Sequence, residues 1–137
     1  MSKSVIAFSS GGYVNLTAGI PVTIAFGTTD TDVQFFVLGV ASLIKLLTAS
    51  YFPISGQELG AGESLQFQLK LAPCGGTTFL ETGVTCSLNP SNPTRTSKKK
   101  ILTSKNDKVA LQVIFISPDP TRVITVNMGS SLVIKVN

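Results

Sequence analysis

The most constraining feature of the sequence is a run in which apolar and polar residues alternate strictly. Within residues 63–71 the apolar positions are Leu65, Phe67, Leu69 and Leu71. The positions between them are Gln66, Gln68 and Lys70. Because successive side chains of a strand point to opposite faces of a sheet, this run predicts an antiparallel strand with one buried and one hydrated face.

Further short apolar segments recur along the chain and are separated by turn-forming residues. They predict strands at 5–8, 21–26, 33–38, 109–116, 122–128 and 131–136, and a hairpin of 77–80 with 84–88 around a turn at 81–83. The continuous apolar run 33–38 is typical of a strand buried on both faces. Eight to ten short strands in 137 residues predict one all-β domain, residues 1–137, folded as an antiparallel jelly-roll sandwich.

The segment 43–52 fits two kinds of structure. Leu43, Leu47 and Tyr51 have the spacing of one helix face, whereas Thr48 and Phe52 favour a strand. Both alternatives stay open from the residues alone.

The chain is unusually poor in charge, which bears on whether it acts alone. Charged residues make up 13% of the sequence, against about 25% in an average soluble domain. Isolated domains need charge to remain apart in solution. We therefore expect much of the folded surface to be covered by other copies of the chain.

The absence of histidine removes most enzyme chemistry. Without an imidazole there is neither a Ser-His-Asp nor a Cys-His arrangement, nor a base that titrates near neutral pH. Glu58 and Glu63 flank a glycine-rich turn and are interpreted as solvated turn residues rather than an acid–base pair. Asp30 and Asp32 lack a third carboxylate for a calcium loop. We expect no enzymatic activity, no metal and no cofactor.

Two cysteines allow one disulfide. Cys74 and Cys86 lie near opposite ends of the predicted 77–88 hairpin, where a bridge closing about a dozen residues would contribute about 3 kcal/mol. The alternative is a pair of reduced, partly buried thiols, and the sequence does not decide between them.

A basic segment near residue 100 is the candidate contact for an anionic partner. Its members are Arg95, Lys98, Lys99, Lys100, Lys105 and Lys108. No aromatic residue occurs between Phe79 and Phe115, so bases would have nothing to stack on, and nucleic acid is not expected as a partner. The alternative interpretation is a solvated loop.

Neither a membrane span nor a secretory signal is expected. The longest apolar stretch, 35–47, is interrupted by Gly39, Ser42 and Lys45. Only four apolar residues follow Lys3 and Ser4 before a Ser-Ser-Gly-Gly sequence, which is too few for a signal peptide.

The order of these motifs resembles a known family. The segments that carry the resemblance are Val-Ile-Ala-Phe-Ser-Ser-Gly at 5–11, the apolar strand 33–38, Ala-Ser-Leu-Ile through Ala-Ser-Tyr-Phe at 41–52, the alternating strand 65–71, Thr-Phe through Leu-Asn-Pro at 78–90, and the strands at 109–116 and 124–136. Together they are similar to the C-terminal jelly-roll domain of the collagen-like exosporium glycoproteins of spore-forming bacteria (BclA/BclB type). The collagen-like stalk of that family is missing here, and the cysteines and the lysine run are additional.

This resemblance implies a jelly roll like that of the tumour-necrosis-factor superfamily, commonly trimeric, with residues 43–52 as a strand. It implies a location on the spore surface or on an extracellular appendage, where the chain would be a self-assembling homotrimer or filament, alone or with other spore-surface proteins. The alternatives are a trimeric receptor- or glycan-binding tip and a viral or phage coat or fibre protein.

For assembly we expect an N-terminal strand to add to the sheet edge of a neighbouring copy. Its residues are Val5, Ile6, Ala7 and Phe8, and residues 9–12 would form a flexible leash within the N-terminal segment 1–12.

Overall fold

The structure is a computed structural model that describes residues 3–25, 28–30 and 35–136, and the described part of the chain contains no helix. The eleven strands of these residues are β1 (Lys3–Thr17), β2 (Val22–Ala25), β3 (Thr28–Asp30), β4 (Phe36–Val37), β5 (Ser42–Pro53), β6 (Ser64–Ala72), β7 (Leu80–Leu88), β8 (Thr94–Ser97), β9 (Ile101–Leu102), β10 (Lys108–Ile116) and β11 (Val123–Val136). The prediction of an all-β fold is confirmed.

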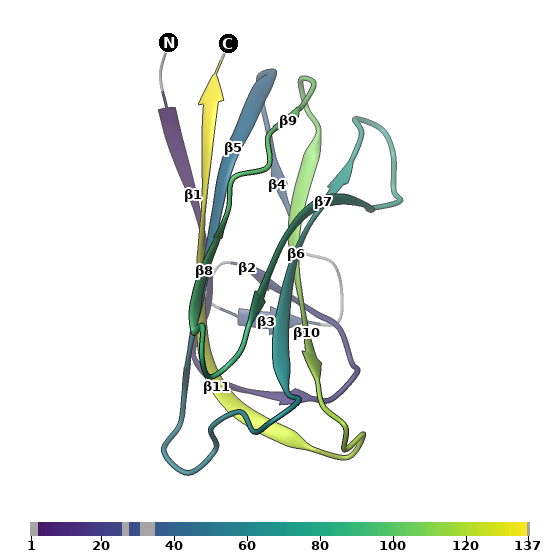
Figure 1. The fold of residues 1–137 in the computed structure, drawn as a ribbon. Helices are drawn as coiled ribbons and strands as arrows, with labels where there is room; N and C mark the ends of the chain where they lie inside the picture. Colours follow the sequence, from purple (N-terminus) through teal and green to yellow (C-terminus); the bar gives the residue numbers. More distant parts are fainter. Residues whose placement is uncertain (1–2, 26–27, 31–34, 137) are drawn as a thin grey trace.

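The strands form two facing antiparallel sheets (Figure 1). One sheet has the order β1-β11-β5-β8, with β9 also paired to β5; we call it the terminal sheet because it contains the first and the last strand. The other has the order β3-β2-β10-β6-β7, with β4 also paired to β10; we call it the β10 sheet. Most neighbouring strands are distant in the sequence, as expected for a jelly-roll sandwich, and of the described strands only the pairs β2–β3 and β6–β7 are consecutive.

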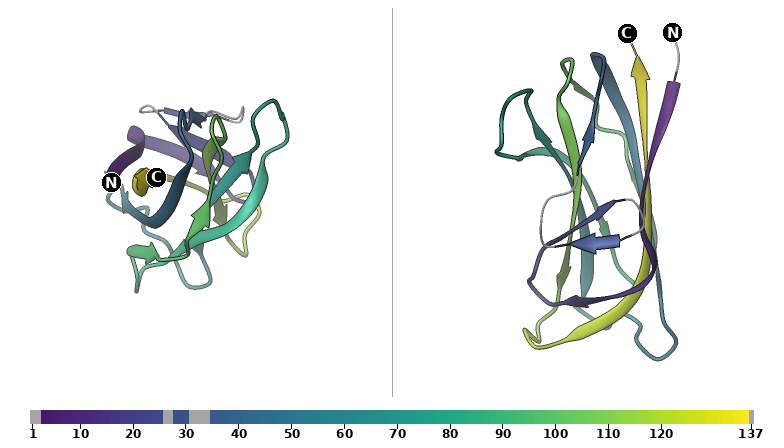
Figure 2. Two further views of the ribbon diagram at one scale, coloured as in Figure 1. Left: turned by 90° about the horizontal axis from the view of Figure 1, so that it is seen from above. Right: turned by 180° about the vertical axis from the view of Figure 1, so that it is seen from behind.

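Both ends of the described chain lie at the same pole of the sandwich (Figures 1 and 2). This follows from the pairing of β1 with β11, in which Lys3 lies opposite Lys135. The 54–63 and 117–122 loops lie at the opposite pole (Figure 1).

The core fills the space between the sheets. Its largest fully buried side chains include Phe8, Leu16, Ile44, Leu47, Phe67, Leu111, Phe115 and Ile124, which come from both sheets. In β6 the alternation predicted from the sequence is confirmed: Leu65, Phe67 and Leu69 are fully buried, and the intervening glutamines are not.

Several predicted elements are longer or shorter in the structure. Residues 43–52 form a strand, within β5. The predicted strands 122–128 and 131–136 are one continuous strand, β11, because Gly129 keeps an extended conformation with no positive φ. Of the predicted strand 33–38, only Phe36–Val37 is a strand among the described residues, and Val37 is 54% exposed, so the expectation of two buried faces is wrong.

The predicted hairpin around 81–83 is also wrong. Residues 80–88 form the single strand β7, which pairs with β6. Gly83 does adopt a positive φ of 80°, as a turn glycine would, but it lies at an irregularity of the ladder between Gln68 and Lys70 of the partner strand. The positive-φ glycine therefore marks a bulge rather than a turn.

Candidate functional site

The outward face of the terminal sheet is the first candidate. Opposite residues on its strands form rows, and one row is Ala7, Ser131, Thr48 and Thr96 from β1, β11, β5 and β8. The next row is Ser9, Gly129, Ser50 and Thr94. The hydroxyl oxygens of Thr48 and Thr96 lie 3.0 Å apart on this surface. The centre of the face is therefore covered by small, uncharged side chains.

Larger apolar side chains border this centre and are exposed to solvent. Val5, Tyr13, Phe52 and Val123 are 64%, 50%, 69% and 48% exposed. Tyr13 and Phe52 lie on either side of Asn127 in the row next to Gly129. Between the Tyr13 row and the Val5 row, none of the outward residues of β1, β11, β5 and β8 is charged.

A hollow of about 400 Å³ opens on this face over Gly129. It is lined by Ser9, Ser50, Tyr51, Phe52, Thr94, Asn127, Met128 and Gly129. The face thus offers a recess beside an exposed aromatic ring, which is a combination that a second protein surface can fill.

The outward face of the β10 sheet has a different character. Lys70 lies opposite Glu81, and Gln68 lies between Gln112 and Thr85. These charged and amide side chains are ordinary hydrated surface. The two faces of the sandwich are therefore chemically distinct.

The second candidate is a group of lysines at the pole where the chain ends lie. We call Lys3, Lys45, Lys98, Lys100 and Lys135 the lysine cluster. Four of them, with Leu46 and Val133, line a hollow of about 300 Å³. The fifth, Lys135, is directly opposite Lys3 in the β1–β11 ladder. Like charges in directly opposed positions of a sheet repel each other.

Lys45 occupies the centre of the lysine cluster because of a β-bulge. Val133 pairs with Leu46 and Ile134 pairs with Ile44, which leaves Lys45 as the extra residue of β5. Lys45 and Leu46 are both half-buried between the buried Ile44 and Leu47. The charge of Lys3 lowers the pKa of Lys45, with smaller contributions from desolvation and from Lys135 and Lys100.

The six basic residues predicted to contact an anionic partner do not lie together in the structure. Lys98 and Lys100 lie in the cluster, whereas the ammonium of Lys99 lies against Gly83 of β7. Lys108 donates to the Gly76 carbonyl and lies over the Phe35 ring, 5.4 Å from its centroid. Arg95 is exposed on β8, and Lys105 is exposed between β9 and β10.

Three members of the cluster, Lys3, Lys45 and Lys135, are not predicted from the sequence. They are isolated in the sequence, and only the pairing of β1, β11 and β5 brings them together. None of the three lies in a run of basic residues that would have indicated the cluster.

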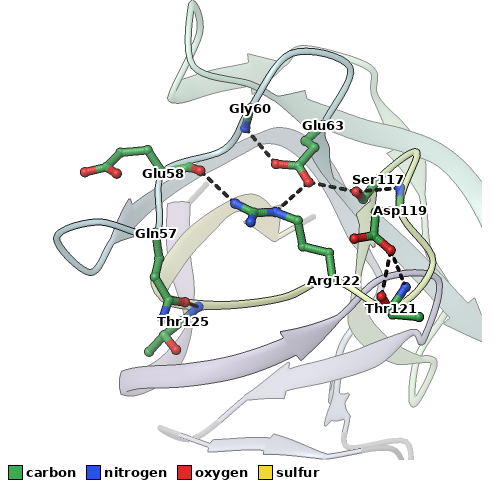
Figure 3. A network of polar contacts seen from close by, with 9 residues as sticks. All are labelled: Gln57, Glu58, Gly60, Glu63, Ser117, Asp119, Thr121, Arg122 and Thr125. Carbon is green, nitrogen blue, oxygen red and sulfur yellow. Dashed lines mark hydrogen bonds and ion pairs between the residues drawn. The ribbon is translucent and has the colours of Figure 1, made fainter.

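A network of polar contacts occupies the opposite pole (Figure 3). Glu63 is its centre: Oε1 accepts from the Gly60 N–H at 2.7 Å, and Oε2 accepts from the Ser117 hydroxyl at 2.7 Å. Arg122 forms an ion pair with the same carboxylate and donates from Nη2 to the Glu58 carbonyl at 3.0 Å. The network holds the 54–63 loop against the 117–122 loop.

The interpretation of Glu63 as a solvated turn residue is therefore wrong. Its side chain is 6% exposed, because Arg122 and the two loops cover it. Burial alone would raise its pKa, but the hydrogen bonds from Gly60 and Ser117 and the charge of Arg122 hold the pKa below its usual value. Every oxygen of this carboxylate already has a partner, so the arrangement is that of a structural anchor.

The cysteines do not form a disulfide in the structure. Cys74 is exposed and Cys86 is buried, and both are free thiols. Cys86 lies opposite Phe67, which is seven residues before Cys74, so the separation along the strand is roughly 20 Å. Bridged Cα atoms lie within about 7 Å of each other. Both thiols are free, as in the alternative prediction, but only Cys86 is buried.

The N-terminal strand is part of the fold of its own chain. Val5, Ile6, Ala7 and Phe8 pair with β11, and Phe8 is a core residue at 1% exposure. Residues 9–12, expected to form a leash, lie within β1 at a break in its register. The expectation of a separate leash is not met, since this segment is a strand.

In the described residues, no helix has the length and apolar character needed to cross a bilayer. No group of three or more potential metal-binding side chains occurs among them; Asp30 is in β3, and Asp32 lies outside the described residues.

Comparison with solved structures supports the jelly-roll assignment. VP2 of infectious bursal disease virus in a subviral particle matches with a TM-score of 0.62 and 11% identity, over 98% of this chain and 33% of that chain. A chain of the T13 particle of the same virus matches with a TM-score of 0.55 and 9% identity, over 98% of this chain and 31% of that one. The chain thus spans about a third of these viral chains.

Eiger TNF from S. frugiperda matches with a TM-score of 0.48 and 12% identity, over 97% of this chain and 93% of that one. No protein-family model matches the sequence, and no curated protein matches it. The protein therefore has a jelly-roll β-sandwich of the kind found in the VP2 capsid protein, without assignment to a family.

Proposed function

We propose that the protein is a non-enzymatic structural subunit that assembles with copies of itself through the outward face of the terminal sheet. The observation that carries this proposal is the uncharged centre of that face, with exposed Tyr13 and Phe52 beside the hollow over Gly129. Depletion of charge together with exposed aromatic side chains is typical of a contact with another protein.

The size of the face suits a stable contact. The strands of the terminal sheet contain 15, 14, 12, 4 and 2 residues, which at about 3.3 Å rise and about 4.8 Å spacing cover roughly 700 Å², including the end that bears Lys3, Lys45 and Lys135. A standard interface buries about 800 Å² on each partner. A second copy is the occupant we propose because the low charge of the whole chain favours association with itself.

The proposed place of this assembly is a bacterial spore surface layer or an extracellular appendage. The support for that location is the resemblance of the sequence motifs to the exosporium glycoprotein domain. A second candidate is a coat protein of a virus or phage, which the structural likeness to VP2 favours over the fibre and receptor-tip alternatives. Both functions use the same property, a jelly roll that packs against copies of itself.

The test is a matched pair of arginine substitutions. Ser131→Arg places a charge in the centre of the proposed contact, between Ala7 and Thr48. Gln68→Arg places the same charge at the corresponding position of the β10 sheet, between Gln112 and Thr85. Both sites are half-buried on central strands with small or flexible neighbours, and circular dichroism checks that each variant is folded.

We expect light scattering and negative-stain images to show assemblies for the unmodified chain and for Gln68→Arg, and monomers for Ser131→Arg. A monomeric unmodified chain at all concentrations would overturn the proposal, and so would assemblies that persist in Ser131→Arg. The images also separate a filament or layer from a closed shell, and so distinguish the two candidate locations.

A further inference from the structure

We propose that the lysine cluster is a binding site for a compact multivalent oxyanion, such as a polyphosphate or a sulfated or phosphorylated sugar. This goes beyond self-assembly, because all five lysines come from one chain and the site is complete in a single copy. The proposal rests on one observation: Lys3, Lys45, Lys98 and Lys100 line the same hollow of about 300 Å³.

The lysine cluster has no internal counter-charge in the described part of the chain. The one ion pair among the described residues is that between Arg122 and Glu63, at the other pole of the sandwich. Among the described residues, the charges that lower the pKa of Lys45 are those of Lys3, Lys135 and Lys100. An arrangement of five ammonium groups without a carboxylate is electrostatically unfavourable until an anion enters it.

The backbone enforces the crowding of these lysines. Lys3 and Lys135 are opposed in the ladder, so the two side chains leave the same face of adjacent strands. The extra residue in β5 turns Lys45 outward beside them. Lys98 and Lys100 follow β8, and the intervening Lys99 turns away to Gly83. The backbone positions of Lys3, Lys45 and Lys135 cannot separate without changing the pairing of β1, β11 and β5.

The lining of the hollow indicates the class of anion. Leu46 and Val133 are the apolar lining residues, and no aromatic ring lines the hollow, so it lacks the stacking platform that nucleic-acid bases need. Ammonium groups act as point charges and suit tetrahedral oxyanions, whereas planar carboxylates favour the fork of arginine. Several positive charges in one small hollow match a multivalent ligand rather than a monovalent ion.

The experiment measures binding of inorganic tripolyphosphate by calorimetry at low salt, with sodium chloride of the same ionic strength as the control for screening. The variants are Lys45→Gln and Lys98→Gln within the cluster, and Lys70→Gln on the β10 sheet as the matched control. We expect each cluster variant to weaken binding roughly tenfold, because one charged hydrogen bond is lost, and Lys70→Gln to bind as the unmodified chain does.

A second readout does not require the ligand. Removing one of several mutually repelling charges should raise the thermal midpoint of Lys45→Gln in low salt, and adding chloride should shrink that difference. Equal weakening by Lys45→Gln and Lys70→Gln would overturn the proposal, as would a response to tripolyphosphate no larger than that to chloride. A sulfated oligosaccharide and its unsulfated form, tested in parallel, separate a sugar-borne oxyanion from a free one.

Discussion

Arg122 places its Nε atom 2.6 Å from Oε2 of Glu63, a carboxylate whose side chain is only 6% exposed. The two residues are 59 positions apart in the sequence and belong to the two loops that close one pole of the sandwich (Figure 3). Their ion pair is the main polar link between these loops, and its removal provides the first test of the structure.

The substitution Glu63→Gln should destabilise the fold. It leaves the positive charge of Arg122 in a partly buried position without its partner, and breaking a buried pair costs about 3–5 kcal/mol. Because the Arg122 side chain is 35% exposed and water can reach it, we expect a smaller loss, about 1–3 kcal/mol. Urea unfolding measures the loss. Glu58→Gln is the control, since the exposed Glu58 contributes its backbone carbonyl to Arg122, and it should change stability by less than about 0.5 kcal/mol.

The pH dependence of stability should report the same carboxylate. The pKa of Glu63 is lowered in the folded protein, so its contribution to stability is complete above the unfolded pKa of about 4.3. The contribution is lost as the pH falls from about 5 through the folded value, because protonation then favours the unfolded chain.

The variant Glu63→Gln separates the contribution of Glu63 ionisation from that of the other carboxylates. We expect the thermal midpoint of the unmodified chain to fall more steeply below about pH 5 than that of Glu63→Gln. Asp119, whose pKa is lowered by hydrogen bonds from Thr121, titrates in both proteins and so cancels in the comparison. Parallel curves for the two proteins would contradict the assigned role of Glu63.

The two thiols should differ in reactivity. Cys74 is exposed, whereas burial raises the pKa of Cys86 and so reduces its thiolate fraction. We expect a thiol reagent to modify one cysteine in the folded protein and both in denaturant, with peptide mass spectrometry assigning the first to Cys74. An intact mass two hydrogens lower, with no free thiol in denaturant, would instead demonstrate the Cys74–Cys86 bridge.

Gly83 should be intolerant of substitution for a backbone reason. Its φ of 80° is in the left-handed region, and a Cβ atom there would overlap the Lys99 ammonium. We expect Gly83→Ala to cost about 1–2 kcal/mol in urea unfolding. Gly39→Ala is the matched control, because Gly39 has no positive φ and nothing lies within 4 Å of the point where its Cβ atom would be. Equal effects of the two substitutions would show that Gly83 is not strained in solution.

The parts of the fold predicted correctly are those specified by local pattern. The alternation at Leu65, Phe67 and Leu69 defines a strand and its buried face without knowledge of its neighbours. The ambiguity at 43–52 arose because Leu43, Leu47 and Tyr51 have helical spacing. In the structure the bulge at Lys45 shifts the strand's phase, so that Ile44 and Leu47 both face the core.

The parts that could not be predicted depend on pairing between distant segments. A glycine in a polar sequence indicates a turn, yet Gly83 and Gly129 lie inside long strands because β6 and β5 run alongside them. The burial of Glu63 requires Arg122, and the lysine cluster requires both chain ends at one pole. In each case the residues that contact one another are far apart in the sequence, so no short segment contains both of them.

The pairing of β1 with β11 also has a consequence for how the protein is made. Translation produces β1 before β11, its partner strand, and residues 18–122 separate the two. Pairing between such distant segments is slow because closing a long loop costs entropy. The nascent chain therefore carries β1 unpaired, with Phe8 and Leu16 uncovered, until β11 has been synthesised. A cell producing this protein has to protect that strand from premature aggregation until β11 is available to pair with it.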